Sequence, residues 1–234
     1  MLERSVSLVI PVADEPRNLT LPLALWSADK YAPWLKVVLV GDPTGLQPLA
    51  LSQPSGHCLP FLQQSPFDPL GNTTQMLRLA AHTPNDIVTD PFIWSNDDIY
   101  FRRPVTLDDV RTAGSTARGD LRDVPVNGRH GKRAGQTRAT LEGLGLPTWD
   151  YERHVPLLIH KDDLLHAVGR DDVNPRSMYL NHALERPSFI QDDVKAFRPG
   201  ELAALPDSPF FSTGHRFPIS AVADFLGYAA ADGG

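Results

Sequence analysis

The stretch Leu35-Lys36-Val37-Val38-Leu39-Val40-Gly41-Asp42 decides the fold class. Its apolar run is continuous, which is typical of a strand buried on both faces of a parallel sheet. Another β-branched apolar stretch, Val6 to Val12, lies upstream, and a helical pattern from Leu21 to Lys30 separates the two. Strand, helix and strand in this order predict a βαβ unit, and therefore an α/β fold with a mostly parallel central sheet flanked by helices.

The rest of the chain carries weaker signals of the same kind. The residues from Pro43 to Pro69 are rich in Pro, Gln, Ser and Gly and are predicted to be irregular, apart from a short strand near Leu59 to Leu62. The further elements that we expect are a helix from Thr73 to His82 with Asn72 as its N-cap, strands at Phe92–Trp94 and Leu157–Ile159, a helix over Asp162–Val168, a helix that begins after Asn174 and a docked tail from Phe210 to Tyr228.

Composition limits the class of protein. The 234 residues suit one domain spanning residues 1–234, and 41% hydrophobic with 21% charged residues excludes a disordered chain or a coiled coil. The single cysteine, Cys58, excludes an intramolecular disulfide. The chain contains no signal-peptide pattern and no apolar run of about 18 residues, so we expect a cytoplasmic protein without a membrane span. A net charge of −6 argues against a general nucleic-acid binder.

One segment departs from this acidic balance. Between Arg111 and Arg138 several basic residues, among them Arg129, Lys132 and Arg133, alternate with glycines. One interpretation is a flexible, solvated loop. The other is a mobile basic loop, over residues 111–138, that meets phosphates by closing on a donor or by holding an anionic acceptor such as a nucleic acid.

The strongest chemical signal is Phe92-Ile93-Trp94-Ser95-Asn96-Asp97-Asp98, in which an apolar strand ends in an amide and two carboxylates. Ligands of open α/β sheets bind beyond the carboxyl ends of the strands. Asp97 and Asp98 there suit Mg²⁺ or Mn²⁺, which would neutralise a diphosphate, with Asn96 as a substrate contact. Asn-Asp-Asp is also good turn chemistry, so spacing alone leaves both interpretations open.

Two other residues are candidates. His154 stands in the charged cluster Glu152-Arg153-His154, just before a strand, where a general base is compatible with the pattern. Arg176 follows Asn174-Pro175 and so falls in the first turn of a helix, where an acidic residue is the usual choice. A basic residue at that position hints at an anionic ligand.

Three blocks in order resemble the Stealth family of sugar-1-phosphate transferases. They are Leu23–Val40 with Ala32-Pro33-Trp34 at its centre, Phe92–Phe101 with Asn96-Asp97-Asp98, and His154-Val155-Pro156 followed by Arg176. The resemblance covers about half of the chain. It implies a fold like that of the GT-A nucleotide-sugar transferases, with Asp97 and Asp98 in the metal and diphosphate region, Asp98 also in the catalytic centre, His154 as the base and Arg176 as a phosphate clamp.

Two blocks depart from the family pattern. Of the family's opening block, only the position after a strand and an acidic residue are kept, at Asp14-Glu15. The segment from Pro209 to His215 lacks the family's Asn-Asp pair.

The resemblance as a whole implies a transferase that moves a sugar 1-phosphate from a nucleotide sugar to an acceptor hydroxyl. Two alternatives stay open: a metal-dependent transferase of the sugar itself, acting on a glycan, a small molecule or a nucleic acid, and a binding module that has lost turnover.

Overall fold

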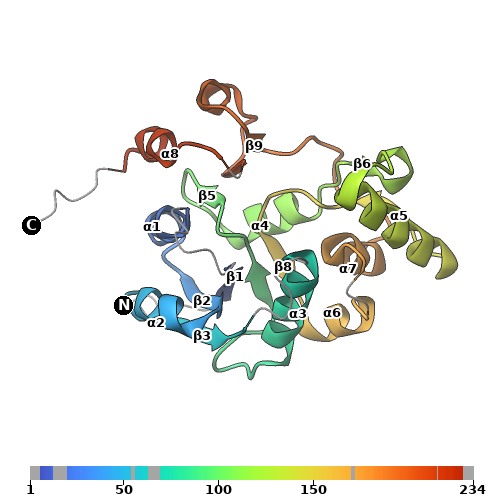
Figure 1. Cartoon of the computed structure of the whole chain (residues 1–234), viewed down its shortest axis with the longest axis horizontal. Coiled ribbons are helices and arrows are strands. Elements are labelled where there is room, and N and C mark those ends of the chain that lie inside the picture. The colour runs from blue at the N-terminus through green and yellow to red at the C-terminus, as the bar shows by residue number, and fades with distance from the viewer. Residues whose placement is uncertain are drawn as a thin grey trace, which may run out of the picture.

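The computed structural model describes residues 6–12, 20–53, 56–62, 69–169, 172–214 and 216–228. Its main feature is a five-stranded sheet in the order β3-β2-β1-β4-β8 (Figure 1). The strands are β1 Val6–Pro11, β2 Leu35–Gly41, β3 His57–Pro60, β4 Phe92–Trp94 and β8 Leu157–Ile159. The first four are parallel and β8 is antiparallel to β4, so the predicted α/β fold with a mostly parallel sheet is confirmed.

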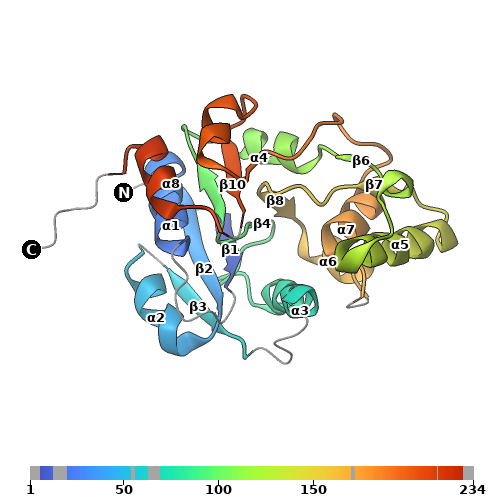
Figure 2. The same ribbon diagram turned by 45° about the horizontal axis from the view of Figure 1, so that its top comes forward.

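Alternate residues of the central strand serve two different cores. Leu8 and Ile10 pack with the buried side of α1 (Leu21–Tyr31), whereas Val9 packs with Met76 of α3 (Pro69–His82). Because successive side chains of a strand point to opposite faces, the sheet lies between two helical layers. Figure 2 shows α1 on one side of β1 and β2 and α3 on the other.

A smaller sheet stands next to the carboxyl end of β4. Its strands, in the order β5-β10-β9, are β5 Ile99–Phe101, β10 Phe210–Thr213 and β9 Lys195–Ala196. The ring of Tyr100 stacks near that of Phe211, and α8 (Ile219–Leu226) covers them with Val222. The expected docking of the tail is thereby confirmed. Asp14-Glu15 and His215, which entered the comparison with the Stealth pattern, lie outside the described residues.

The remaining elements cover the sheet or join its parts. They are α2 Pro43–Leu51, α4 Leu107–Gly114, β6 Gly119–Asp120, η1 Leu121–Asp123, α5 Gly128–Gly143, β7 Trp149–Asp150, α6 Lys161–Ala167, α7 Pro175–Ala183 and η2 Pro199–Ala204. The strand at Leu157–Ile159 and the helices near Asp162 and after Asn174 agree with the sequence predictions. No helix within the described ranges has the length and apolarity that crossing a bilayer requires.

Two local predictions are wrong. The stretch after Pro43 is not irregular throughout, because the Asp42 side chain accepts a hydrogen bond from Thr44 N at 2.9 Å and so caps helix α2. Helix α3 begins at Pro69, so Asn72 lies inside its first turns and does not cap it. Asn72 is buried there and faces the site described below.

The basic segment also differs from the expected loop. Residues 128–143 form helix α5, and Arg133 on its buried side is only 6% exposed. The glycines serve close packing here. A Cβ on Gly131 would lie 2.0 Å from the Pro125 carbonyl oxygen, and Gly128 adopts a φ of +71° at the start of the helix. In the sequence, glycines between basic residues indicate a flexible loop, but in the structure Gly131 allows close contact with a neighbouring backbone and Gly128 allows a turn with positive φ.

Candidate active site

A cavity of about 840 Å³ opens at the carboxyl ends of β1 and β4. Pro11 ends β1, and Ser95 N, just after β4, donates to Val9 O at 3.0 Å, which holds the two strand ends together. Three groups of residues line the cavity: Asn72, Thr73 and Met76 of α3, the Asn96-Asp97-Asp98 turn, and a charged cluster of Arg118, His130, Glu152, Arg153, His154, Arg176, Asp192, Asp193 and Lys195. Asn96, Asp97, Asp98, His154 and Arg176 are thus brought to one cavity.

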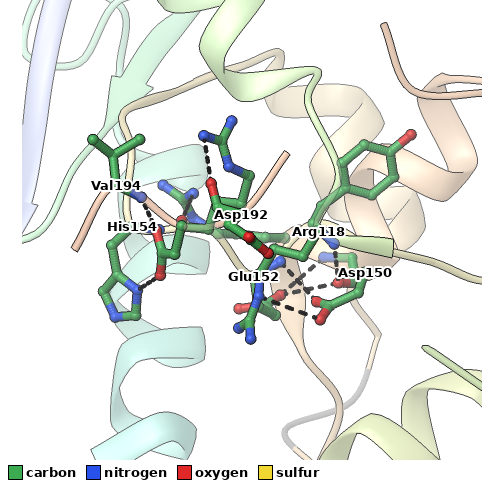
Figure 3. Close-up of polar contacts among 11 residues, drawn as sticks. Arg118, Asp150, Glu152, His154, Asp192 and Val194 are labelled. Carbon is green, nitrogen blue, oxygen red and sulfur yellow. Dashed lines mark hydrogen bonds and ion pairs between the residues drawn. The ribbon is translucent and has the colours of Figure 1, made fainter. Parts of the chain in front are cut away.

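His154 is held by Asp193 at two points. The carboxylate accepts the His154 backbone N–H at 2.8 Å, and its other oxygen lies 2.6 Å from Nδ1 of the ring (Figure 3). Burial would raise the pKa of Asp193, but the hydrogen bonds and charge of His154, together with the charge of Arg118, lower it to about 2. With Asp193 ionised, Nδ1 of His154 carries a proton, and in the neutral form of the ring Nε2 then carries the free lone pair.

Arg176 holds the backbone on both sides of His154. Its two terminal nitrogens donate to the carbonyl oxygens of Arg153 and Val155, and its side chain is buried. Two of the five guanidinium N–H groups are therefore used to fix this segment. Burial lowers the pKa of Arg176, while the neighbouring Glu152 and Asp193 act in the opposite direction. Arg176 lines the cavity as well, so its position suits the support of His154 as much as contact with an anion.

Glu152 links this segment to helix α7. Its Oε1 accepts the backbone N–H of Ser177 at 3.0 Å, in the first turn of the helix, where a carboxylate is favourable. Burial raises the pKa of Glu152, although Arg176 acts against that shift. Figure 3 shows Glu152 beside Asp150, whose Oδ1 accepts the Glu152 backbone N–H at 3.0 Å.

Asp98 is the candidate metal ligand whose surroundings are best defined. Its Oδ2 lies 3.5 Å from Nζ of Lys195, and its Oδ1 is buried without a hydrogen-bond partner among the described residues. An orphaned carboxylate oxygen is a fitting ligand for a hard cation. Within the described ranges, however, no group of three or more His, Cys, Asp or Glu side chains is arranged to hold a metal. Asp97 and Asp98 therefore stay candidate metal ligands predicted from the sequence.

The predicted phosphate-binding residues of the basic segment are not among those lining the cavity. Arg129 and Lys132 are exposed on α5, and Arg133 is buried. The same segment contributes two other groups, Arg118 and His130. Arg118 comes from the strand edge before β6, where its Nε lies 3.9 Å from Asp150.

Sequence reasoning missed Asp193 and Lys195. A signal for Asp193 was present in the sequence. Phe189-Ile190-Gln191-Asp192-Asp193 has apolar residues followed by an amide and two carboxylates, the same order as in Phe92–Asp98. Lys195 gave no local signal. It reaches Asp98 because β9 and β5 both pair with β10.

Comparison with solved structures identifies the architecture. The fold resembles that of galactosyltransferase LgtC. That structure, a complex with donor and acceptor sugar analogues, superimposes with a TM-score of 0.53 and 13% sequence identity over 97% of this chain and 98% of LgtC. The GT-A-like architecture expected from the sequence is thereby confirmed. Neither a protein-family model nor a curated protein matches the chain, so the resemblance to the Stealth family stays a prediction.

Proposed function

We propose that residues 1–234 form one catalytic domain of a nucleotide-sugar-dependent transferase, which moves a sugar 1-phosphate to an acceptor hydroxyl. The observation that carries the proposal is the His154–Asp193 pair in a cavity at the carboxyl ends of β1 and β4. A base fixed by a carboxylate suits removal of a proton from a hydroxyl. The likeness to LgtC supports a nucleotide sugar as the donor.

In the proposed reaction, Nε2 of His154 takes the proton of the acceptor hydroxyl. The acceptor oxygen forms a bond to the phosphorus that carries the sugar, and the bond from that phosphorus to the nucleoside monophosphate breaks. Asp193 keeps the ring oriented and balances the charge of the imidazolium as it forms. The products are a sugar phosphodiester on the acceptor and a nucleoside monophosphate.

Several groups of the cavity would meet the negative charge of the donor. Lys195, Arg118 and Arg176 line the cavity, and Asn96 lines it as a further polar contact. Phosphoryl transfer depends mainly on such positioning and electrostatic stabilisation. Asp97 and Asp98 are the residues that would hold Mg²⁺ or Mn²⁺, and that ion would add positive charge at the diphosphate when bound.

Transfer of the sugar itself is the second candidate, and the likeness to a galactosyltransferase favours it. The acceptor oxygen would then attack the anomeric carbon, and a nucleoside diphosphate would leave. The same residues can serve either path, since both need an activated hydroxyl and a neutralised phosphate. The acceptor of either reaction carries a hydroxyl, on a glycan or a small molecule. A nucleic-acid acceptor is a prediction from the sequence, and so is a cytoplasmic location of the protein.

The two chemistries differ in their nucleotide product. The purified chain is incubated with a panel of nucleotide sugars, with Mg²⁺ or Mn²⁺, and the nucleotides are separated by chromatography. A nucleoside monophosphate supports sugar-phosphate transfer, and a nucleoside diphosphate supports glycosyl transfer. His154→Ala should lower the formation of either product by about 10²- to 10⁴-fold. Lys36→Met on β2, outside the cavity, serves as the control. Donor binding without any turnover would instead favour a binding module.

A further inference from the structure

The segment from Asp193 to Phe197 presents a row of side chains to the cavity. Asp193, Lys195 and Phe197 all line it, while the intervening Val194 and Ala196 are fully buried in the core. This alternation is that of an extended strand, whose odd and even residues face opposite sides. The pairing of β9 with β10 and the hydrogen bond from Gly214 N to Ala196 O, at 2.9 Å, hold the segment extended.

Phe197 differs from its neighbours in this row because its ring is apolar and 68% exposed. Its position is defined nonetheless. The backbone N–H donates to Glu201 Oε2 at 2.7 Å, and a Cβ on Gly214 would lie 3.0 Å from the ring. A glycine at position 214 thus leaves room for the ring to lie against the backbone. An exposed aromatic ring with one supported side is suited to stacking on a flat apolar surface.

We propose that Phe197 is the aromatic platform of an acceptor subsite, on which a sugar ring stacks by its apolar face. The proposal rests on the proposed function, since it assigns the acceptor of the same cavity. Phe197 follows β9, and the His154–Asp193 pair belongs to the charged cluster that lines the same cavity. The lining residues Pro11 of β1 and Asn72, Thr73 and Met76 of α3 are assigned to the nucleotide, because ligands of such sheets bind beyond the carboxyl ends of the strands.

The spacing of the row defines the length of the acceptor. Asp193 and Phe197 are four residue steps apart in an extended chain, which is about 13 Å at about 3.3 Å per step. That distance exceeds one pyranose ring. The sugar whose hydroxyl meets His154 is therefore not the sugar that stacks on Phe197, and the acceptor is a glycan of two or more units.

Binding of paired glycosides tests this subsite without requiring turnover. The probes are methyl glucoside with methyl maltoside and methyl cellobioside, and methyl galactoside with methyl lactoside, titrated by saturation-transfer NMR. Wild type should bind at least one disaccharide about three- to tenfold more tightly than its monosaccharide, and Phe197→Ala should remove that advantage. Phe197→Trp should retain it. Phe189→Ala, which removes a ring that is 63% exposed but does not line the cavity, should change nothing.

Three results would overturn the proposal: no disaccharide exceeding its monosaccharide on wild type, a disaccharide preference that survives in Phe197→Ala, or a weaker nucleotide-sugar affinity in Phe197→Ala. The last would mean that the ring stacks on the nucleobase. Hydrolysis of nucleotide sugar in the absence of acceptor reports separately on the proposed function. If wild type hydrolyses none, the transferase proposal fails, while the glycoside titration still decides the role of Phe197.

Discussion

Replacement of Asp193 by asparagine changes the charge beside His154 while keeping the shape of the side chain. In the native structure one carboxylate oxygen accepts the backbone N–H groups of His154 and Val194, at 2.8 and 3.0 Å. The other lies 2.6 Å from Nδ1. With asparagine, the amide oxygen satisfies the backbone donors, and the NH₂ group faces Nδ1. Nδ1 must then accept, so the ring proton moves to Nε2 and the base is lost.

The size of the effect follows from the role of the ring. A positioned general base contributes about 10²- to 10⁴-fold, so Asp193→Asn should lower turnover by about that factor. The affinity for the donor should not fall, because Asp193 lines the cavity and its replacement removes a negative charge that would face the phosphates. Loss of a charge-assisted hydrogen bond should also cost about 1.5–3 kcal/mol of stability.

Turnover is measured by nucleotide release, and donor affinity by calorimetry. Asp193→Asn, His154→Ala and the double variant are compared with wild type. Residues that act as a unit are not additive, so the double variant should be no slower than His154→Ala alone. Near-normal turnover of Asp193→Asn, or additive losses in the double variant, would refute the dyad.

The same carboxylate predicts a dependence of stability on pH. The pKa of Asp193 falls from 3.8 to about 2 on folding, so the native state binds fewer protons than the unfolded state in that range. The contribution, on the order of 2 kcal/mol, is fully present above about pH 4 and is lost as the pH falls towards 2. Chemical denaturation between pH 5 and pH 2 should show this loss in wild type and a smaller one in Asp193→Asn. Parallel curves would contradict the shift.

Five further substitutions, in three groups, test other residues of the chain. Asp97→Asn and Asp98→Asn should each weaken nucleotide binding in Mg²⁺ or Mn²⁺ without unfolding the chain; calorimetry that shows unchanged affinity in both would withdraw the metal assignment. A lysine at position 176 cannot donate to both carbonyl oxygens beside His154, so Arg176→Lys should lower the free energy of unfolding by about 1–3 kcal/mol. The melting temperature measures this loss, and an unaltered thermal transition would disprove it. On α5, Lys132→Ala should change the free energy of unfolding by no more than about 0.5 kcal/mol, because Lys132 is exposed, whereas Arg133→Ala should lower it further because Arg133 is buried. A raised donor KM in Lys132→Ala would restore the phosphate role of this helix.

Local patterns were sufficient for the sheet and for part of the site. The apolar runs at Val6–Val12 and Leu35–Val40 predict strands of a βαβ unit, and the two strands pair in parallel as expected. Asn96-Asp97-Asp98 could be found because a strand that ends abruptly in polar residues marks the edge where ligands bind. His154 could be found by its place before β8. Each of these signals lies within a few consecutive residues.

Glycine misled the interpretation of the basic segment. In sequence, glycines between arginines indicate a flexible chain, yet Gly131 lies against the backbone at Pro125 and helix α5 continues through it. Whether a glycine gives freedom or close packing depends on what stands opposite it. That neighbour is set by tertiary structure.

The sequence by itself determined the alternation of strands and helices, the acidic turn after β4 and the identity of the candidate base. Only the tertiary structure decided which residues complete the site. Asp193 meets His154 from 39 positions away, and Lys195 meets Asp98 across a sheet whose strands come from distant parts of the chain. Such pairs are created by strand pairing and crossover connections. The physical reason is that hydrophobic periodicity records which face of an element is buried, but not which polar groups the packing brings together.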